Sequence, residues 1–177
     1  MGHRTLVAYE RDGYDLHYAH WGVDPGVLTP DTPFGGSPND GWANERAGEL
    51  LTPAGGRLED DHGTAVDTDP IATGLSFVEL GAHVDPIEHE ALYVVDGAFS
   101  VRTYLIFGLD GRPFGHTDGP VVALVGYDGE ADAAYLRGWL AGGRAVRGVC
   151  GPEEGAVVKA LRWLDADRGT VVWMAGA

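Results

Sequence analysis

The seven histidines are the side chains of this 177-residue chain that are best suited to catalysis or metal binding. An imidazole titrates near pH 6.5, so each of them could act as an acid, a base or a metal ligand. The strongest pair is His3 and His20, which we expect to lie close together at the end of a hairpin. A third ligand could be a carboxylate or another histidine that the fold brings close, namely His83, His89 or His116. This set predicts a site for a divalent metal, although a histidine buried against backbone groups explains each residue taken singly.

Aromatic side chains cluster around the same hairpin. Tyr18 and Trp21 lie within and just after its second strand, and Trp42 lies near a Pro- and Gly-rich segment further on. Exposed aromatic residues are enriched at the contact surfaces of proteins. We therefore take these three residues as candidates for binding a partner or a ligand.

Known catalytic signatures are absent from the sequence. There is no phosphate-binding loop, no GxGxxG after a strand, no HExxH and no GxSxG. The chain has one cysteine, Cys150, which excludes an internal disulfide bond. Two functions stay open. The first is a non-enzymatic module that binds a protein partner or a small ligand. The second is a metal-assisted hydrolase built on His3 and His20.

The hairpin itself is predicted from alternation and turn chemistry. Apolar residues alternate on both sides of Asp12-Gly13, and Asp-Gly suits a two-residue type I′ turn. Such a turn pairs Tyr9 with Leu16 and places Thr5 opposite His20, with His3 as a diagonal neighbour. A change of one residue in the loop would move every side chain to the other face.

The rest of the chain predicts further strands followed by helices. A second hairpin turns at Asp96-Gly97, and the apolar run at residues 121–127 is typical of a buried strand. Two helices and a last strand at residues 170–174 follow. The long connection through both helices favours a parallel arrangement of these last two strands. In the first helix, Gly142-Gly143 is expected to end or break the element, and the core-facing residues are expected to be Ala131, Ala134, Tyr135 and Trp139.

These elements indicate an α+β fold in a single domain, residues 1–177. The sheet is expected to be mostly antiparallel and built from hairpins, with the two C-terminal helices packed on one face and a final C-terminal strand. Two loops, residues 23–41 and 55–70, are long and rich in Pro, Gly or acidic residues. Phe34 and Trp42 suggest that the first loop docks on the body of the domain.

The charge of the chain limits its partners and its environment. There are 27 acidic residues against 12 basic ones, giving a formal charge of −15, and only one of the basic residues is a lysine. Such a surface repels nucleic acid and anionic membranes. It is typical of a cytoplasm of molar salt, where the Debye length is roughly 3 Å at 1 M. We found no apolar run long enough to span a membrane and no N-terminal signal segment, which predicts a cytoplasmic protein.

Two stretches carry a resemblance to a known group of proteins. With MGHRTLVAYERDGYDLHYAHWG and, further on, EALYVVDGAFSVRTYL, the chain resembles an uncharacterised family of haloarchaeal proteins, a domain of unknown function. The resemblance covers most of the chain. It implies a salt-adapted cytoplasmic protein and implies no activity, cofactor or catalytic residue. A divalent metal, a protein partner and self-association into a homo-oligomer therefore rest on the residues alone.

Overall fold

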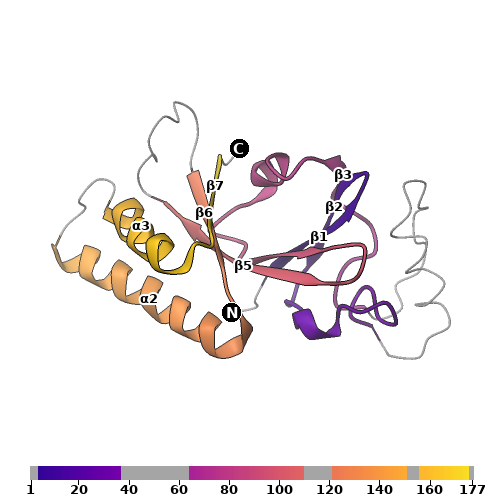
Figure 1. Ribbon diagram of the computed structural model, residues 1–177, viewed down its shortest axis with the longest axis horizontal. Helices are drawn as coiled ribbons and strands as arrows, with labels where there is room; N and C mark the ends of the chain where they lie inside the picture. The colour runs from indigo at the N-terminus through magenta and orange to yellow at the C-terminus, as the bar shows by residue number, and fades with distance from the viewer. Residues whose placement is uncertain (1–3, 37–63, 110–120, 151–155, 176–177) are drawn as a thin grey trace. The chain divides into compact units, whose positions relative to one another are not determined.

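The computed structural model describes residues 4–36, 64–109, 121–150 and 156–175 (Figure 1). These residues form seven strands: β1 Thr5–Arg11, β2 Gly13–Ala19, β3 Ala72–Leu75, β4 Ala91–Val95, β5 Val101–Gly108, β6 Val121–Gly126 and β7 Val171–Ala175. The helices are α2 Gly129–Cys150 and α3 Ala156–Arg168, with two short 3₁₀ turns, η1 Pro25–Val27 and η2 Glu79–His83. The strand order is β3-β2-β1-β4-β5-β6-β7. The α+β class, the mostly antiparallel sheet, the two helices and the final strand are thus confirmed.

The chain divides into two compact units. The first comprises residues 1–80 and 88–103, and the second comprises residues 81–87 and 104–177. Strand β5 begins in the first unit and continues into the second.

The first hairpin forms, but its register differs by one residue from the expected one. Tyr9 pairs with Asp15 and Thr5 pairs with Ala19. Gly13 alone takes a positive φ at the turn, +101°, so the type I′ turn, which needs two such residues, does not form. A side chain at Gly13 would also meet the backbone of Gly74 in β3, with Cβ 2.9 Å from its carbonyl carbon. The expected pairs of Tyr9 with Leu16 and of Thr5 with His20 were therefore wrong.

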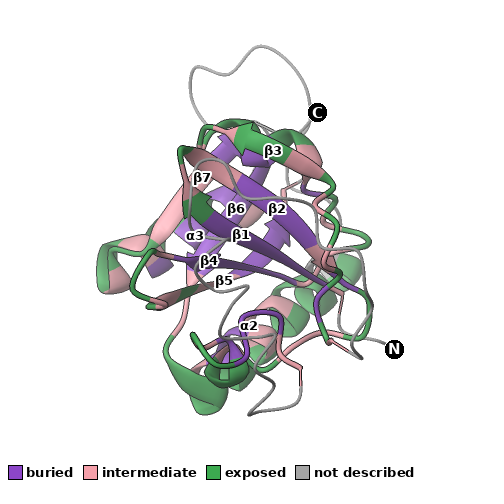
Figure 2. Cartoon of the chain, turned by 90° about the vertical axis from the view of Figure 1, so that its right-hand side faces the viewer, coloured by how far each residue is buried: buried purple, intermediate pink, exposed green. Residues whose placement is uncertain are grey.

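Strand β1 is the centre of the first unit. It pairs antiparallel with β2 on one side and parallel with β4 on the other, where Thr5 lies opposite Ala91 and Tyr9 opposite Val95. Residues 5–9 are all buried, and Figure 2 shows β1 and β2 largely in the purple of buried residues, whereas β3 at the edge is mostly green. In a strand that is covered on both faces, successive residues are all buried, as they are here in TLVAY.

The described part of the first long loop docks on this unit, as expected from Phe34. Leu28 and Phe34 are buried, with exposed fractions of 2% and 1%. The backbone amides of Ala65 and Val66 both donate to the Phe34 carbonyl. Trp42 and residues 55–63 lie outside the described part of the chain.

Asp96-Gly97 in the sequence predicts a two-residue turn for the second hairpin, but the turn is longer. The Asp96 amide donates to the Ser100 carbonyl at 3.1 Å, leaving a three-residue loop between them. The Asp96 carboxylate accepts from the amides of Ala98 and Ser100 at 2.9 and 2.8 Å. Phe99 takes a positive φ of 59°, the left-handed position that such loops require.

In the second unit, α2 differs from the expectation in two ways. It continues through Gly142-Gly143 to Cys150 instead of ending there. Its fully buried residues are Ala133 and Leu136, whereas Tyr135 is 59% exposed. The other three expected core residues are not fully buried either: Ala131 and Ala134 are exposed and Trp139 is half-buried. For α3, helical spacing in the sequence predicts a buried stripe of Val157, Val158, Leu161 and Leu164. Val158, Leu161 and Leu164 are buried and Val157 is half-buried, so this prediction is largely confirmed.

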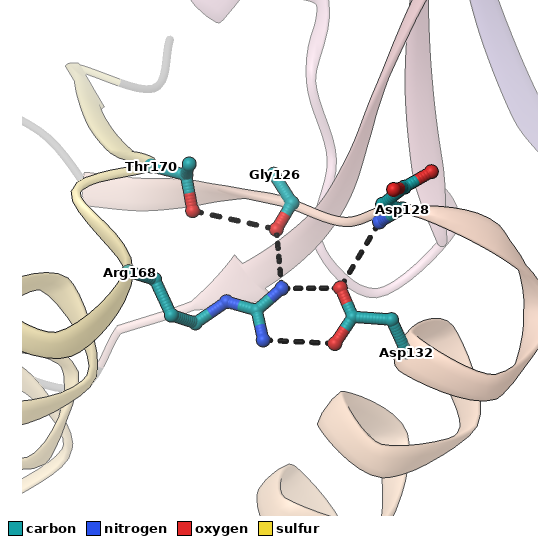
Figure 3. A network of polar contacts seen from close by, with 5 residues as sticks. All are labelled: Gly126, Asp128, Asp132, Arg168 and Thr170. Carbon is teal, nitrogen blue, oxygen red and sulfur yellow. Dashed lines mark hydrogen bonds and ion pairs between the residues drawn. The ribbon is translucent and has the colours of Figure 1, made fainter.

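Strands β6 and β7 are antiparallel, which corrects the expected parallel pair. The reason is that two helices, and not one, connect them, so the chain returns to the end of the sheet from which it left. Arg168 at the end of α3 donates to both carboxylate oxygens of Asp132 in the first turn of α2 (Figure 3). Arg168 also donates to the Gly126 carbonyl at 3.2 Å, as Thr170 does at 3.4 Å. This network holds the end of β6 beside the start of β7.

Candidate functional site

A tight turn at the end of β2 presents two of the predicted site residues. The Gly22 amide donates to the Ala19 carbonyl at 3.2 Å, so His20 and Trp21 are the central residues of a four-residue turn. Gly22 closes the turn with a φ of +76°. Trp21 is 79% exposed, and its ring lies edge-to-face with His20 at 4.7 Å between centroids. The turn therefore presents a large apolar surface to solvent.

Tyr18 joins this turn to a second histidine. Its ring centroid lies 5.9 Å from that of His20 and 5.9 Å from that of His89, both in an edge-on arrangement. We call Tyr18, His20, Trp21 and His89 the aromatic cluster. All four belong to the first unit, and they combine apolar ring faces with two imidazole groups.

The parallel pairing of β1 with β4 is what brings His89 to the cluster. The Glu90 amide donates to the Arg4 carbonyl at 2.9 Å, which fixes the chain just before β4 against the start of β1. The Arg4 side chain donates to Glu88 at 2.9 Å, but both side chains are largely exposed, so this ion pair adds little stability.

A different histidine, His17, is buried inside the same hairpin. The exposed fraction of His17 is 1%, and its Nδ1–H donates to the Asp67 carbonyl at 2.9 Å. A carbonyl can only accept, so Nδ1 carries the proton and Nε2 has the lone pair. Among the described residues none gives Nε2 a hydrogen bond. Burial lowers the pKa of His17 to about 4, so the ring is neutral at pH 7.

Aromatic rings surround His17 on its own face of the sheet. Tyr9 packs edge-to-face against it at 5.2 Å, and Phe34 lies 5.4 Å away. The Tyr9 hydroxyl donates to the Pro33 carbonyl, and burial raises the pKa of that hydroxyl far above its usual range. His17 is thus a structural residue that ties the loop at Asp67 to the hairpin, and it is not offered to a substrate.

The structure unites some of the predicted site residues and leaves others untested. Tyr18, His20 and Trp21 lie together at the end of β2. His3 and Trp42 lie outside the described residues, so the predicted pairing of His3 with His20 and the role of Trp42 stay predictions. Within the described ranges, no group of three or more His, Cys, Asp or Glu side chains is arranged to hold a metal ion.

His89 is one of the three histidines that the sequence offered as a third metal ligand, and the structure places its ring beside Tyr18. It stands 69 residues after His20 in the chain. It lies close to Tyr18 because β1 and β4 pair in parallel, and no turn motif in the sequence predicts that pairing.

The aromatic cluster can form apolar contacts through its rings and hydrogen bonds through its two imidazole groups. The exposed Trp21 ring can pack against an apolar surface, and the histidines can donate or accept hydrogen bonds around it. A metal would need further ligands besides His20 and His89.

Comparison with known proteins gives a family and no activity. The chain matches a family of unknown function, DUF6735, over residues 1–172. Neither a curated protein nor a solved structure matches it. In the part of the chain that the structure describes, no helix has the length and apolar character needed to cross a bilayer.

Proposed function

We propose that this chain, which belongs to the family of unknown function DUF6735, is a non-enzymatic module that binds a protein partner through its aromatic cluster. The observation that carries the proposal is the exposure of Trp21, 79%, at the apex of a turn braced by His20 and Tyr18. A tryptophan held in this way loses little conformational freedom on binding, and tryptophan is among the residues that contribute most to protein interfaces.

A protein partner fits this surface better than a small ligand. Sites for small molecules are concave and enclose most of the ligand, whereas Trp21 projects from a turn. A protein surface with an apolar pocket can instead receive the ring. We therefore favour a protein over a small ligand as the molecule that binds the aromatic cluster.

The test uses two tryptophans of nearly equal exposure. Trp21 is 79% exposed in the first unit and Trp163 is 78% exposed on α3 in the second. A photo-crosslinking residue at position 21 should capture one protein that the same residue at position 163 does not. With that protein purified, Trp21→Ala should weaken binding by about 30-fold, as expected for a residue worth about 2 kcal/mol. Trp163→Ala should leave binding unchanged. Equal capture at both positions, or equal loss of affinity, would contradict the proposal.

A metal-assisted hydrolase is the second candidate, supported by the placement of His20 and His89 against the same tyrosine ring. The ligands would be these two histidines and His3, with the metal activating a water molecule. Metal content of the protein purified in molar KCl tests this candidate. A stoichiometric transition metal that is lost in His20→Ala and kept in His83→Ala would make the hydrolase the primary function. Absence of metal in all three samples would remove it.

The setting of this function is also part of the proposal. A formal charge of −15 with a single lysine supports a salt-adapted, haloarchaeal protein of the cytoplasm that avoids nucleic acid and membranes. We further propose that residues 1–177 act as one domain, that the two C-terminal helices pack on one face of the sheet, and that the chain binds a protein partner or associates into a homo-oligomer.

A further inference from the structure

Two exposed acidic residues lie on the segments that adjoin the aromatic cluster. Asp24 stands three residues after Trp21 and caps η1, where its Oδ1 accepts from the Gly26 amide at 2.8 Å. Asp67 adjoins β2 itself, because its amide donates to the Tyr18 carbonyl at 2.8 Å. Both acidic residues are exposed. The aromatic cluster therefore has a carboxylate on each of two neighbouring segments.

The segments that carry these two carboxylates also approach one another. A Cβ built at Gly35 would lie 3.1 Å from Cγ2 of Val23 and 3.3 Å from Cβ of Ala65. Val23 directly precedes Asp24, and Ala65 stands two residues before Asp67. Both carboxylates therefore belong to the part of the first unit that surrounds the end of β2.

The arginines that the structure describes in the first unit are already engaged with other carboxylates. The pairs are Arg4 with Glu88 at 2.9 Å, Arg11 with Asp15, and Arg102 with Glu10 at 3.9 Å. Among the described residues, no ion pair includes Asp24 or Asp67. Two negative charges beside the aromatic cluster are thus left for a partner to match.

We propose that the partner of the aromatic cluster presents an arginine, whose guanidinium stacks on the exposed ring of Trp21 while Asp24 and Asp67 supply the matching negative charge. This inference rests on the function proposed above and names the chemistry of the partner. Indole is the aromatic ring that attracts cations most strongly. A guanidinium is planar and always charged, so it can stack on the ring and donate hydrogen bonds to carboxylates at the same time.

A purely apolar partner fits this surface less well. To cover Trp21 it would also have to exclude water from the neighbourhood of Asp24 and Asp67. Removing water from a charged group that gains no partner is unfavourable. An arginine avoids this penalty because it brings both a positive charge and five N–H donors.

Arginine also suits the saline setting proposed above better than lysine does. The Debye length is roughly 3 Å at 1 M salt, so charges attract one another only when they are in contact. An ammonium group is strongly hydrated, whereas a guanidinium is weakly hydrated and gains from stacking on an aromatic face. We therefore expect arginine to bind more tightly than lysine in molar KCl.

Four synthetic peptides test the inference against the full chain in molar KCl. They share one glycine- and serine-rich sequence and differ only at two positions, which hold arginine, lysine, citrulline or leucine. Binding is followed by NMR at the Trp21 indole N–H and at the backbone amides of residues 18–24. The arginine peptide should bind with a Kd of about 0.1–1 mM, and the citrulline and leucine peptides at least about 10-fold more weakly. The lysine peptide should bind about 3-fold more weakly than the arginine peptide.

Matched substitutions test the role of the two carboxylates. Asp24→Asn and Asp67→Asn each remove one charge, and an asparagine can still cap η1. Each should weaken binding of the arginine peptide about 3-fold, and the two together about 10-fold. Asp12→Asn makes the same change at an exposed position at the opposite end of the β1–β2 hairpin and should leave binding unchanged. Circular dichroism checks that all variants keep the fold.

Several results would overturn the inference. These are citrulline, leucine or lysine peptides that bind as tightly as the arginine peptide, an equal effect of Asp12→Asn and Asp67→Asn, and the absence of any shift at Trp21. A partner captured at position 21 would still support the proposed function in each of these cases. Binding of the arginine peptide that Trp21→Ala leaves intact would instead contradict both proposals.

Discussion

The protonation of one buried residue, His17, makes the stability of the first unit depend on pH. It is buried among Tyr9 and Phe34, and its one hydrogen bond anchors the loop at Asp67. Protonation would place a second N–H, at Nε2, where no described residue accepts it. Burial lowers the pKa of His17, and this effect exceeds the opposing effects of the hydrogen bond to the Asp67 carbonyl and of the charge on Asp15. The folded state therefore keeps this ring neutral down to about pH 4.

The lowered pKa of His17 determines the direction in which the free energy of unfolding changes with pH. Unfolded His17 takes up a proton near pH 6.5, whereas the folded residue does so at about pH 4. Between these values the unfolded chain binds more protons, so stability should fall as the pH decreases through that window, by about 3 kcal/mol from this group. Urea unfolding between pH 7 and pH 4 measures it. His17→Leu should flatten the profile, and His20→Ala, at an exposed position, should keep the slope. An unchanged slope in His17→Leu would contradict the assignment.

At the scale of the elements, the junction at Arg168 decides how the second unit is connected. Arg168 holds α3 against the first turn of α2 and, through the Gly126 carbonyl, against the end of β6. Its hydrogen bonds lower the pKa of Asp132, so the carboxylate stays charged at neutral pH. Paired guanidinium and carboxylate groups that are only 23% exposed are worth more than a pair on the open surface.

Removing this junction should loosen the second unit. Arg168→Ala should reduce the free energy of unfolding by about 1–2 kcal/mol at pH 7, since it breaks a two-pronged charged hydrogen bond. The stabilisation depends on a charged Asp132, whose pKa is lowered in the folded state. It is therefore fully present above pH 4 and lost as the pH falls through that lowered pKa. Denaturant midpoints of the variant and of Arg144→Ala, a control on the exposed part of α2, at pH 7 and pH 3 measure the difference. A similar effect of both substitutions would contradict this role.

The elements also show what a sequence can and cannot predict. Turn residues and alternation predicted both hairpins, and helical spacing predicted most of the buried stripe of α3, because these signals are local. The register of the first hairpin was wrong since it depends on the conformation of one residue, Gly13, which the approach of β3 constrains. The parallel pairing of β1 with β4 has no local signal at all, and the position of His89 depends on it.

Helix α2 was misjudged for a different physical reason. The sequence drew attention to the face with the larger aromatic residues. The fully buried residues of the described helix are instead Ala133 and Leu136, whereas Tyr135 is exposed and Trp139 stacks on Phe107 of β5. Periodicity identifies apolar faces but cannot say which of them the same chain covers.

At the scale of the whole molecule, charge is unevenly shared. The first unit contains 17 of the 27 acidic residues and five of the 12 basic ones, whereas the second contains ten acidic and seven basic residues. Self-repulsion in dilute buffer therefore acts mainly on the first unit. Ions at molar concentration screen charges beyond roughly 3 Å and remove most of this repulsion.

Stability should consequently increase with salt. We expect the melting temperature to rise by about 6 °C between 0.1 and 2 M KCl, as removal of about 2 kcal/mol of repulsion would produce in a chain of this length. Thermal unfolding followed by circular dichroism measures this rise. Sucrose is the control, because it stabilises compact states without screening charge. A melting temperature that is constant or falls with KCl would contradict salt adaptation.

The central position of β1 also sets the order in which the molecule can be assembled. Its parallel neighbour β4 is synthesised long afterwards, since Thr5 pairs with Ala91. Closing so large a loop is entropically unfavourable, and contacts of high sequence separation slow folding. On the ribosome, β1 and β2 must wait with one side of β1 unpaired until residues 91–95 emerge. A chain interrupted before that point would expose an apolar edge, which makes early termination a direct route to aggregation.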